Sequence, residues 1–178
     1  MPFMLYARPY YDSGSQIFTI NAGATIPMSA TWFDGRGTEY WFSGTHQSVG
    51  AYASLSYEVF MNSYFAIGGQ LGFMFDYSNA GKIFTNVPVL LKASVFPLQG
   101  KWELPISIGV GGAYMSYQEG GKFTFMATFE IGLRYYITDE WGVGVHTGIQ
   151  VLPEFYIKDI NSGMFTYLPV TLSAAYRH

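Results

Sequence analysis

Apolar side chains recur at every second position in eight blocks of the chain, and this alternation limits the possible folds more than any other feature of the sequence. In the sixth block, Phe123, Phe125 and Phe129 share one parity, while Thr124 and Thr128 share the other. Successive side chains of a β-strand point to opposite faces, so a period of two predicts strands rather than helices. Each block has roughly the ten residues that a tilted strand needs to cross a bilayer. The blocks are residues 18–26, 48–58, 65–76, 87–95, 106–111, 123–134, 143–150 and 168–173.

The connections between these blocks alternate between short and long. Short turns on one rim and long loops on the other are typical of an up-and-down barrel whose two termini lie on the short-turn side. The chain is long enough for one domain, so residues 1–178 are expected to form a single barrel. Residues 1–14 are expected either to extend the first strand or to form an arm below the barrel. The short turns are residues 61–63, 97–100 and 138–140, and the longer segments are residues 29–46, 78–82, 118–122 and 152–163.

The positions of the charged residues indicate which strand face lies inside. Eight strands enclose an interior only wide enough for side chains to fill, which rules against a soluble, lipocalin-like cup with the bulky residues inside. Only 12% of the residues are charged, about half the share of a soluble domain, so an apolar outer face in contact with lipid is expected. The sequence therefore predicts an all-β, eight-stranded antiparallel transmembrane β-barrel. The charged strand residues that share parity with Gly, Ser and Thr are Glu58, Asp76, Lys92, Glu130 and Arg134.

Aromatic residues cluster near the ends of the blocks. Transmembrane barrels carry such residues in two girdles at the membrane interfaces. The girdle at the short-turn rim is expected to contain Tyr57, Tyr64, Trp102, Tyr135, Trp141 and Tyr176, and the opposite girdle Phe75, Tyr114, Tyr117, Phe123 and Tyr167.

Composition excludes several classes of partner and cofactor. The net charge of −3, without any cluster of Lys or Arg, argues against a nucleic-acid partner. The chain has no cysteine, which excludes disulfides, Cys-based zinc sites and thiol catalysis. Neither a metal-ligand cluster nor a phosphate-binding Gly-rich loop is evident, so no metal and no cofactor are expected.

Three segments resemble a known group of membrane proteins. They are VPVLLK (residues 87–92), PISIGVGGAY (105–114) and EIGLRYYITD (130–139). Together with the eight blocks they are similar to the small eight-stranded outer-membrane barrels of the OmpA-like and OmpW-like families, including versions from spirochaetes. The resemblance implies a bacterial outer-membrane location, with both termini and any arm formed by residues 1–14 in the periplasm.

The inward charges are the first candidate site. Lys92 and Glu130 are expected at comparable depth, as are Glu58 and Arg134 nearer the periplasmic end. An unpaired charge in a dry interior costs several kcal/mol, so these residues are expected to form a ladder of ion pairs. The main hypothesis is a plugged interior, and the alternative is a gate or a narrow polar path.

The histidines offer little support for catalysis. His46 and Ser48 have the H-x-S spacing of lipid A deacylase barrels, but they are expected to point inward and no carboxylate is evident to orient His46. His146 is expected to be a hydrogen-bonded filler of the interior. No catalytic residues are predicted, and a lipid-modifying enzyme is the least favoured reading.

Aromatic residues in two of the long loops form the second candidate site. Large aromatics mixed with charges are common in contact surfaces, and they would equally suit the mouth of a barrel. The first hypothesis is a non-enzymatic membrane anchor whose loops contact a host-surface or envelope partner protein. The alternative is an OmpW-like conduit for small hydrophobic molecules that leave sideways into lipid. The candidate residues are Trp32, Phe33, Arg36, Tyr40, Trp41, Phe42, Phe155 and Tyr156.

Overall fold

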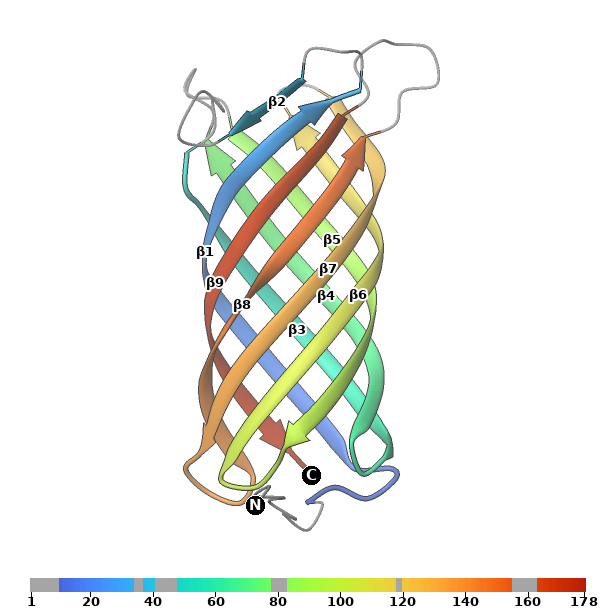
Figure 1. Ribbon diagram of the computed structural model, residues 1–178, viewed down its shortest axis with the longest axis vertical. Helices are drawn as coiled ribbons and strands as arrows, with labels where there is room; N and C mark the ends of the chain where they lie inside the picture. Colours follow the sequence, from blue (N-terminus) through green and yellow to red (C-terminus); the bar gives the residue numbers. More distant parts are fainter. Residues whose placement is uncertain (1–9, 34–36, 41–47, 78–82, 118–119, 155–162) are drawn as a thin grey trace, which may run out of the picture.

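Nine antiparallel strands form one sheet that closes on itself in the computed structural model (Figure 1). Eight of the strands form the barrel, and the pairing of β1 with β9 closes it. The structure describes residues 10–33, 37–40, 48–77, 83–117, 120–154 and 163–178. The strands are β1 (Gln16–Trp32), β2 (Gly37–Tyr40), β3 (Gly50–Asn62), β4 (Phe65–Tyr77), β5 (Ile83–Leu98), β6 (Trp102–Tyr117), β7 (Gly120–Tyr136), β8 (Trp141–Glu154) and β9 (Gly163–Arg177).

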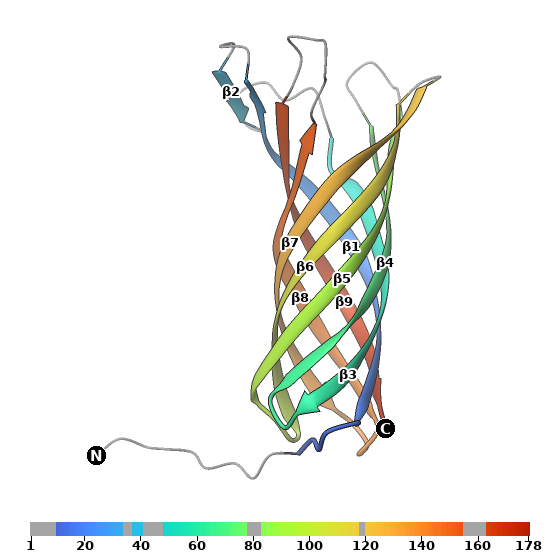
Figure 2. The same cartoon turned by 90° about the vertical axis from the view of Figure 1, so that its right-hand side faces the viewer.

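This architecture confirms the predicted eight-stranded up-and-down barrel. Within the described ranges, no helix is long and apolar enough to cross a bilayer. The three tight connections and the C-terminus lie at one end of the barrel, and β2 lies at the other (Figure 2).

The predicted loop over residues 29–46 was partly wrong. β1 continues to Trp32, although its pairing with β3 ends at Thr25, and β2 pairs with the free edge of β1 beyond that point. The backbone groups on this edge of β1 still need hydrogen-bond partners, and β2 supplies them.

The register fixes how strongly the strands tilt. A path followed from partner to partner around the barrel leaves β1 at Ile17 and returns to β1 at Pro27, a stagger of ten residues. A stagger larger than the number of strands tilts every strand strongly against the barrel axis, so residues at one height come from different positions along successive strands.

The two strand faces have opposite exposure along every barrel strand. On β5, Leu91 is 72% exposed and points outward, whereas its neighbour Lys92 is 2% exposed and points inward. Phe73 and Phe129 are likewise exposed on the outside. A continuous apolar outer face of this kind is suited to hydrocarbon and not to water.

The inward side chains are more varied in size than the sequence pattern suggests. Large inward side chains fit because inward glycines stand beside them. A Cβ at Gly132 would lie 2.6 Å from Cε1 and Nε2 of His146, and one at Gly72 would lie 3.3 Å from Cε2 of Tyr52. The inward glycines therefore leave room for larger neighbouring side chains.

Aromatic rings pair on the outer face at the barrel ends. At the short-turn end, the ring centroids of Trp102 and Tyr135 are 5.0 Å apart, as are those of Trp141 and Tyr176. The expected place of Tyr167 in the opposite girdle was wrong, because Tyr167 shares the inner parity of β9 and is 1% exposed.

Candidate functional site: the barrel interior

Three layers of side chains fill the interior along the barrel axis. A central ionic layer surrounds Lys92, a second ionic group and an aromatic seal occupy the short-turn end, and an apolar layer occupies the end near β2. Apart from Tyr11, the residues of all three layers come from the inward parity of the strands, so the alternation that builds the barrel also builds most of the site.

The central layer holds one cation between two carboxylates. Nζ of Lys92 on β5 lies 3.3 Å from Oε2 of Glu130 on β7 and 3.8 Å from Oε2 of Glu58 on β3. Gln70 donates to Oε1 of Glu130 at 3.2 Å, and Ser94 donates to Glu58. All of these groups are buried, so the added hydrogen bonds offset the second negative charge.

Arg134 on β7 is the centre of the second ionic group. Its Nη1 lies 3.0 Å from Oε1 of Glu103, its Nε donates to Nε2 of His146 at 3.0 Å, and its Nη2 donates to Oγ1 of Thr19 at 3.0 Å. Because Nε2 of His146 accepts this bond, His146 acts here as a neutral acceptor. The guanidinium has a partner on each of three strands besides its own.

The expected pairing of Glu58 with Arg134 differs from the structure. Glu58 pairs with Lys92, and Arg134 pairs with Glu103. Glu103 was missed because the predicted fifth block began at residue 106, whereas β6 begins at Trp102. Extending the alternation of that block by three residues would have placed Glu103 on the inner parity with Ser107.

Tyr11 seals the short-turn end from outside the strands. Its ring stacks on Phe60 with centroids 3.9 Å apart, and its hydroxyl donates to Oε2 of Glu103. Burial, and then the Glu103 carboxylate, raise the pKa of the Tyr11 hydroxyl well above its usual value, so the donor keeps its proton. Residues 10–15 thus cross below the barrel and do not extend β1, and residues 1–9 lie outside the described part of the chain.

Arg177 ties this crossing segment to the turns. Its guanidinium lies between the rings of Tyr10 and Tyr136, 3.6 Å and 3.5 Å from their centroids. It also donates to the backbone oxygens of Asp139 at 2.7 Å and Gly100 at 3.1 Å. Two of the three short turns are therefore fastened to the segment through one side chain.

The layer near β2 is built mainly of apolar side chains that pack against each other. It carries two tyrosines and several methionines, which fill irregular space easily. Sequence reasoning missed this layer because it weighed only the small and charged residues of the inner parity. Its buried members are Tyr52, Met74, Phe84, Leu90, Ala113, Met115, Met126, Leu152 and Tyr167.

The wall between β8 and β9 is interrupted at mid-height. Their pairing runs without a break to Thr147↔Val170 and resumes at Gln150↔Tyr167. Pro169 lies in the gap, and proline has no N–H to donate to the ladder. The hydroxyl of Thr147 donates instead to the Pro169 carbonyl oxygen at 3.0 Å.

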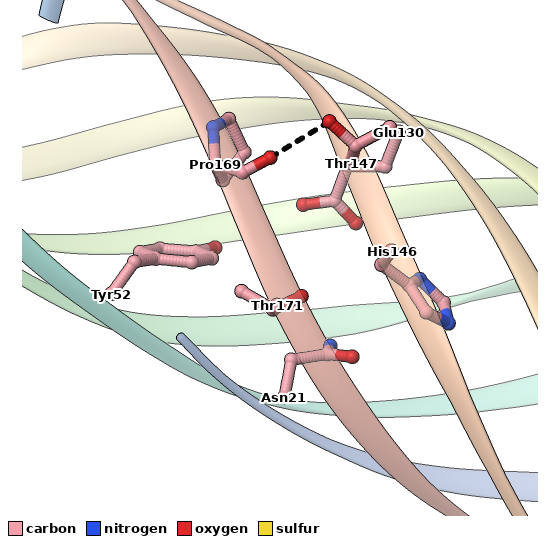
Figure 3. A pocket seen from close by; sticks show the side chains of 7 residues that line it. All are labelled: Asn21, Tyr52, Glu130, His146, Thr147, Pro169 and Thr171. Atoms are coloured by element: carbon pink, nitrogen blue, oxygen red, sulfur yellow. Dashed lines mark hydrogen bonds between the residues drawn. The ribbon is translucent and has the colours of Figure 1, made fainter. Parts of the chain in front are cut away.

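A small cavity lies at this interruption (Figure 3). It offers about 10 Å³ to the centre of a water molecule, which is room for about one water. Inward side chains such as Glu130 and His146 line it together with Thr147, which is exposed on the outer face. The cavity therefore reaches from the interior into the wall. The complete lining is Asn21, Tyr52, Glu130, His146, Thr147, Pro169 and Thr171.

The loop residues are only partly within the described structure. Phe33 and Tyr40 are exposed beside the barrel mouth, and the ring of Trp32 packs edge-on against Phe165 with centroids 5.8 Å apart. The prediction of a contact surface or mouth stays a prediction. The candidates that lie outside the described residues are Arg36, Trp41, Phe42, Phe155 and Tyr156.

Ser48 is the residue of the H-x-S pair that lies within the described part of the chain. Ser48 is exposed, and its hydroxyl donates to the carbonyl oxygen of Tyr77 at 2.9 Å, while His46 lies outside the described residues. A search of the described side chains for three or more His, Asp or Glu placed to hold a metal ion finds no such group.

Comparison with proteins of known sequence finds a relative in a spirochaete. An uncharacterized protein of Treponema pallidum (strain Nichols) is 30% identical over 90 residues, which make up 51% of this chain and 41% of that protein. The chain thus matches about two fifths of the length of this relative.

Comparison with solved structures shows the fold. Neisserial surface protein A (NspA) superimposes with a TM-score of 0.59 at 13% identity, over 92% of this chain and 97% of NspA. The outer membrane protein OprG from Pseudomonas aeruginosa gives a TM-score of 0.52 at 10% identity, over 94% of this chain and 97% of OprG. A protein-family model also matches residues 4–176, nearly the whole sequence. The chain therefore belongs to the family that this model describes, and its fold is that of the small eight-stranded barrels of outer membranes.

Proposed function

We propose that this protein is a non-enzymatic anchor of a bacterial outer membrane, with a plugged interior and with loops that contact a partner. The observation that carries the proposal is the burial of Lys92 between Glu58 and Glu130 in the middle of the barrel. A conducting pore needs a continuous wet path, whereas these three charged groups bind one another and lie out of contact with water.

The layers on either side of Lys92 support the same conclusion. Tyr11, Phe60 and Phe96 pack against each other at the short-turn end. Met74 and Met126 belong to the packed apolar layer near β2. An ion would have to displace side chains in all three layers to cross the barrel.

The orientation follows from the lengths of the connections. Outer-membrane barrels place short turns in the periplasm and longer loops outside. We infer that the C-terminus and residues 10–15 face the periplasm, and that the end carrying β2 faces outward. Lipid of the outer membrane then covers the apolar belt, and the exposed Phe33 and Tyr40 belong to the surface offered to a host-surface or envelope partner protein.

Conductance in planar lipid bilayers tests the plugged interior. The purified protein is expected to give no steady current above that of the lipid alone. A reproducible large-conductance channel from the folded protein would overturn the proposal. Folding is checked on the same sample by heat-modifiable migration on an SDS gel.

The loop surface is tested by replacing residues 32–42 with a Gly/Ser segment of equal length. The barrel is expected to fold, because the eight barrel strands pair with each other independently of β2, while binding to the partner surface is lost. A folded replacement that binds as well as the wild type would remove the loops from the proposal.

A conduit for small hydrophobic molecules is the second candidate function, and the interrupted seam between β8 and β9 favours it. The cavity there joins the inward Glu130 to the outward Thr147. A Thr147→Cys/Val170→Cys disulfide would lock the seam, because these residues are cross-strand partners and the chain has no other cysteine.

The conduit predicts that this lock stops uptake of an apolar dye into cells or vesicles, and that reduction restores uptake. Val143→Cys/Ala174→Cys is the matched control, because it joins the same two strands where their pairing is intact. Uptake that is equal in the locked, control and wild-type proteins would exclude passage through this seam.

A further inference from the structure

Asp76 differs from every other buried carboxylate that the structure describes. Glu58, Glu103 and Glu130 each pair with Lys92 or Arg134. Asp76 on β4 is 0% exposed, and neither of its carboxylate oxygens has a hydrogen-bond partner among the described residues. A charge buried in this way is strongly unfavourable unless an opposite charge joins it.

Neutral oxygen atoms in the same part of the interior also lack hydrogen-bond partners among the described residues, and two of them belong to Asn86 and Thr25. Asn86 on β5 is fully buried, and its amide nitrogen is directed to Sδ of Met126 at 3.8 Å, which leaves its Oδ1 without a partner. Thr25 on β1 is fully buried as well, and its Oγ1 has no partner among the described groups.

The register brings Asn86 close to Asp76. Asp76 is paired with Phe84, two residues before Asn86 on the neighbouring strand. Side chains in this diagonal relation share one face of the sheet, and such residues are roughly 7–8 Å apart, with their Cβ atoms somewhat closer. On the inner side of a narrow barrel, side chains converge further toward the axis.

Gly50 leaves the space between Asp76 and Thr25 open. Gly50 pairs with Thr25, and a Cβ on Gly50 would lie 2.7 Å from Cβ of Asp76. A side chain at this position would therefore separate the two residues. With glycine there, no side chain of β3 stands between Thr25 on β1 and Asp76 on β4.

We propose that Asp76, Asn86 and Thr25 bind a monovalent cation inside the barrel, in the layer nearest β2. The atoms without partners are two carboxylate oxygens, one amide oxygen and one hydroxyl oxygen, which are hard acceptors of the kind that bind hard cations. One carboxylate balances one positive charge, so a divalent ion would leave an excess charge in the dry interior. The occupant is a metal cation such as Na⁺ or K⁺, or a primary ammonium group.

This site does not depend on the proposed anchor function. An anchor would use the bound cation to stabilise the closed barrel, and a conduit would use it to select its ligand. The measurement therefore concerns binding and stability and not transport.

Thermal unfolding in different chloride salts tests the site directly. The folded protein in detergent is heated in NaCl, KCl, methylammonium chloride or N-methyl-D-glucamine chloride at equal ionic strength, and the folded fraction is read from heat-modifiable migration. The midpoint is expected to rise by several degrees in at least one of the first three salts relative to N-methyl-D-glucamine, which is too large for the site. The order of the three salts distinguishes a metal cation from an ammonium group.

Asp76→Asn keeps the shape of the side chain and removes its charge, so the salt-specific shift is expected to disappear. Asp139→Asn is the matched control, because Asp139 is an exposed carboxylate at the opposite end of the barrel, and its variant is expected to retain the shift. If Asp76→Asn does not fold, Thr25→Val removes one oxygen at nearly constant volume. It should then raise the cation concentration needed for half of the shift about tenfold.

Thallium(I), a monovalent ion visible by anomalous scattering, supplies an independent measurement in crystals. An anomalous peak against the Asp76 carboxylate supports the site, and its absence at saturating Tl⁺ counts against a metal cation. Equal midpoints of the wild type in all four salts would overturn the proposal and identify Asp76 as a neutral buried acid. CaCl₂ at the same ionic strength is measured as a fifth salt, and a shift produced only by CaCl₂ would overturn the assignment of a monovalent ion.

Discussion

Arg134 and Glu103 form an ion pair between neighbouring strands, with Nη1 of Arg134 3.0 Å from Oε1 of Glu103 and both side chains 0% exposed. The same carboxylate accepts the Tyr11 hydroxyl, so one acidic residue joins the ionic interior to the segment that crosses the short-turn end. The barrel and its seal are therefore coupled through Glu103.

Removal of Arg134 alone should be strongly destabilising. Arg134→Met leaves the Glu103 carboxylate buried without its cation, and breaking a buried pair in this way costs about 3–5 kcal/mol. The free energy of unfolding, measured with urea in lipid vesicles, should fall by that amount. The double variant Glu103→Gln/Arg134→Met should recover much of the loss, because no uncompensated charge remains. Equal losses in the single and double variants would show that the pair contributes mainly by packing.

Truncation of Tyr11 should weaken the barrel without opening it. Tyr11→Ala removes a ring that stacks on Phe60, and the loss of a buried aromatic side chain costs about 3–5 kcal/mol. Tyr11→Phe keeps the ring and removes only the hydrogen bond to Glu103, which should cost about 1–3 kcal/mol. Planar-bilayer conductance of Tyr11→Ala should stay low because the Lys92 layer still fills the interior. A large steady current from this variant would make Tyr11 the main barrier.

The Tyr11 hydroxyl should also give the protein a sensitivity to alkaline pH. Its pKa is raised by burial in the folded state, so the hydroxyl contributes stability that is complete below the unfolded value of about 10 and is lost as the pH rises above it. The unfolding free energy of the wild type should fall by up to about 1.4 kcal/mol per pH unit more than that of Tyr11→Phe above pH 10. Other tyrosines ionise in both proteins, so the difference between the two curves isolates Tyr11. Parallel curves would place Tyr11 outside the buried network.

A charge on the outer face at mid-height should be costly only if lipid covers that face. Leu91→Arg is expected to lower the unfolding free energy in vesicles by about 2–4 kcal/mol, as arginine does at the midplane of other barrels. Ile137→Arg, at the end of the barrel, is the matched control and should cost about 0–1 kcal/mol, because its charge reaches water. Similar costs at the two positions would contradict the proposed depth of the barrel in the membrane.

The sequence alone determined the number of barrel strands, their antiparallel order and the face that points outward. These properties follow from local pattern, since alternation between Leu91 and Lys92 or between Phe129 and Glu130 sets the face of each residue, and turn length sets the order of the strands. No long-range information was needed for either property.

Only the tertiary structure decided which inward residues meet. The stagger of ten residues around the closed sheet sets the relative height of every strand, and the expected pairing of Glu58 with Arg134 was made without it. The register across β4 brings Glu58 to Lys92, because both residues pair with Gly68, and Asp76 has no hydrogen-bond partner among the described residues. Likewise, Tyr11 lies outside any alternating block, and its place is decided by the exposed end of the barrel that it covers. The face on which a residue lies follows from the alternation of its neighbours in the sequence. Contacts inside the barrel depend instead on strand register and on the closure of the sheet.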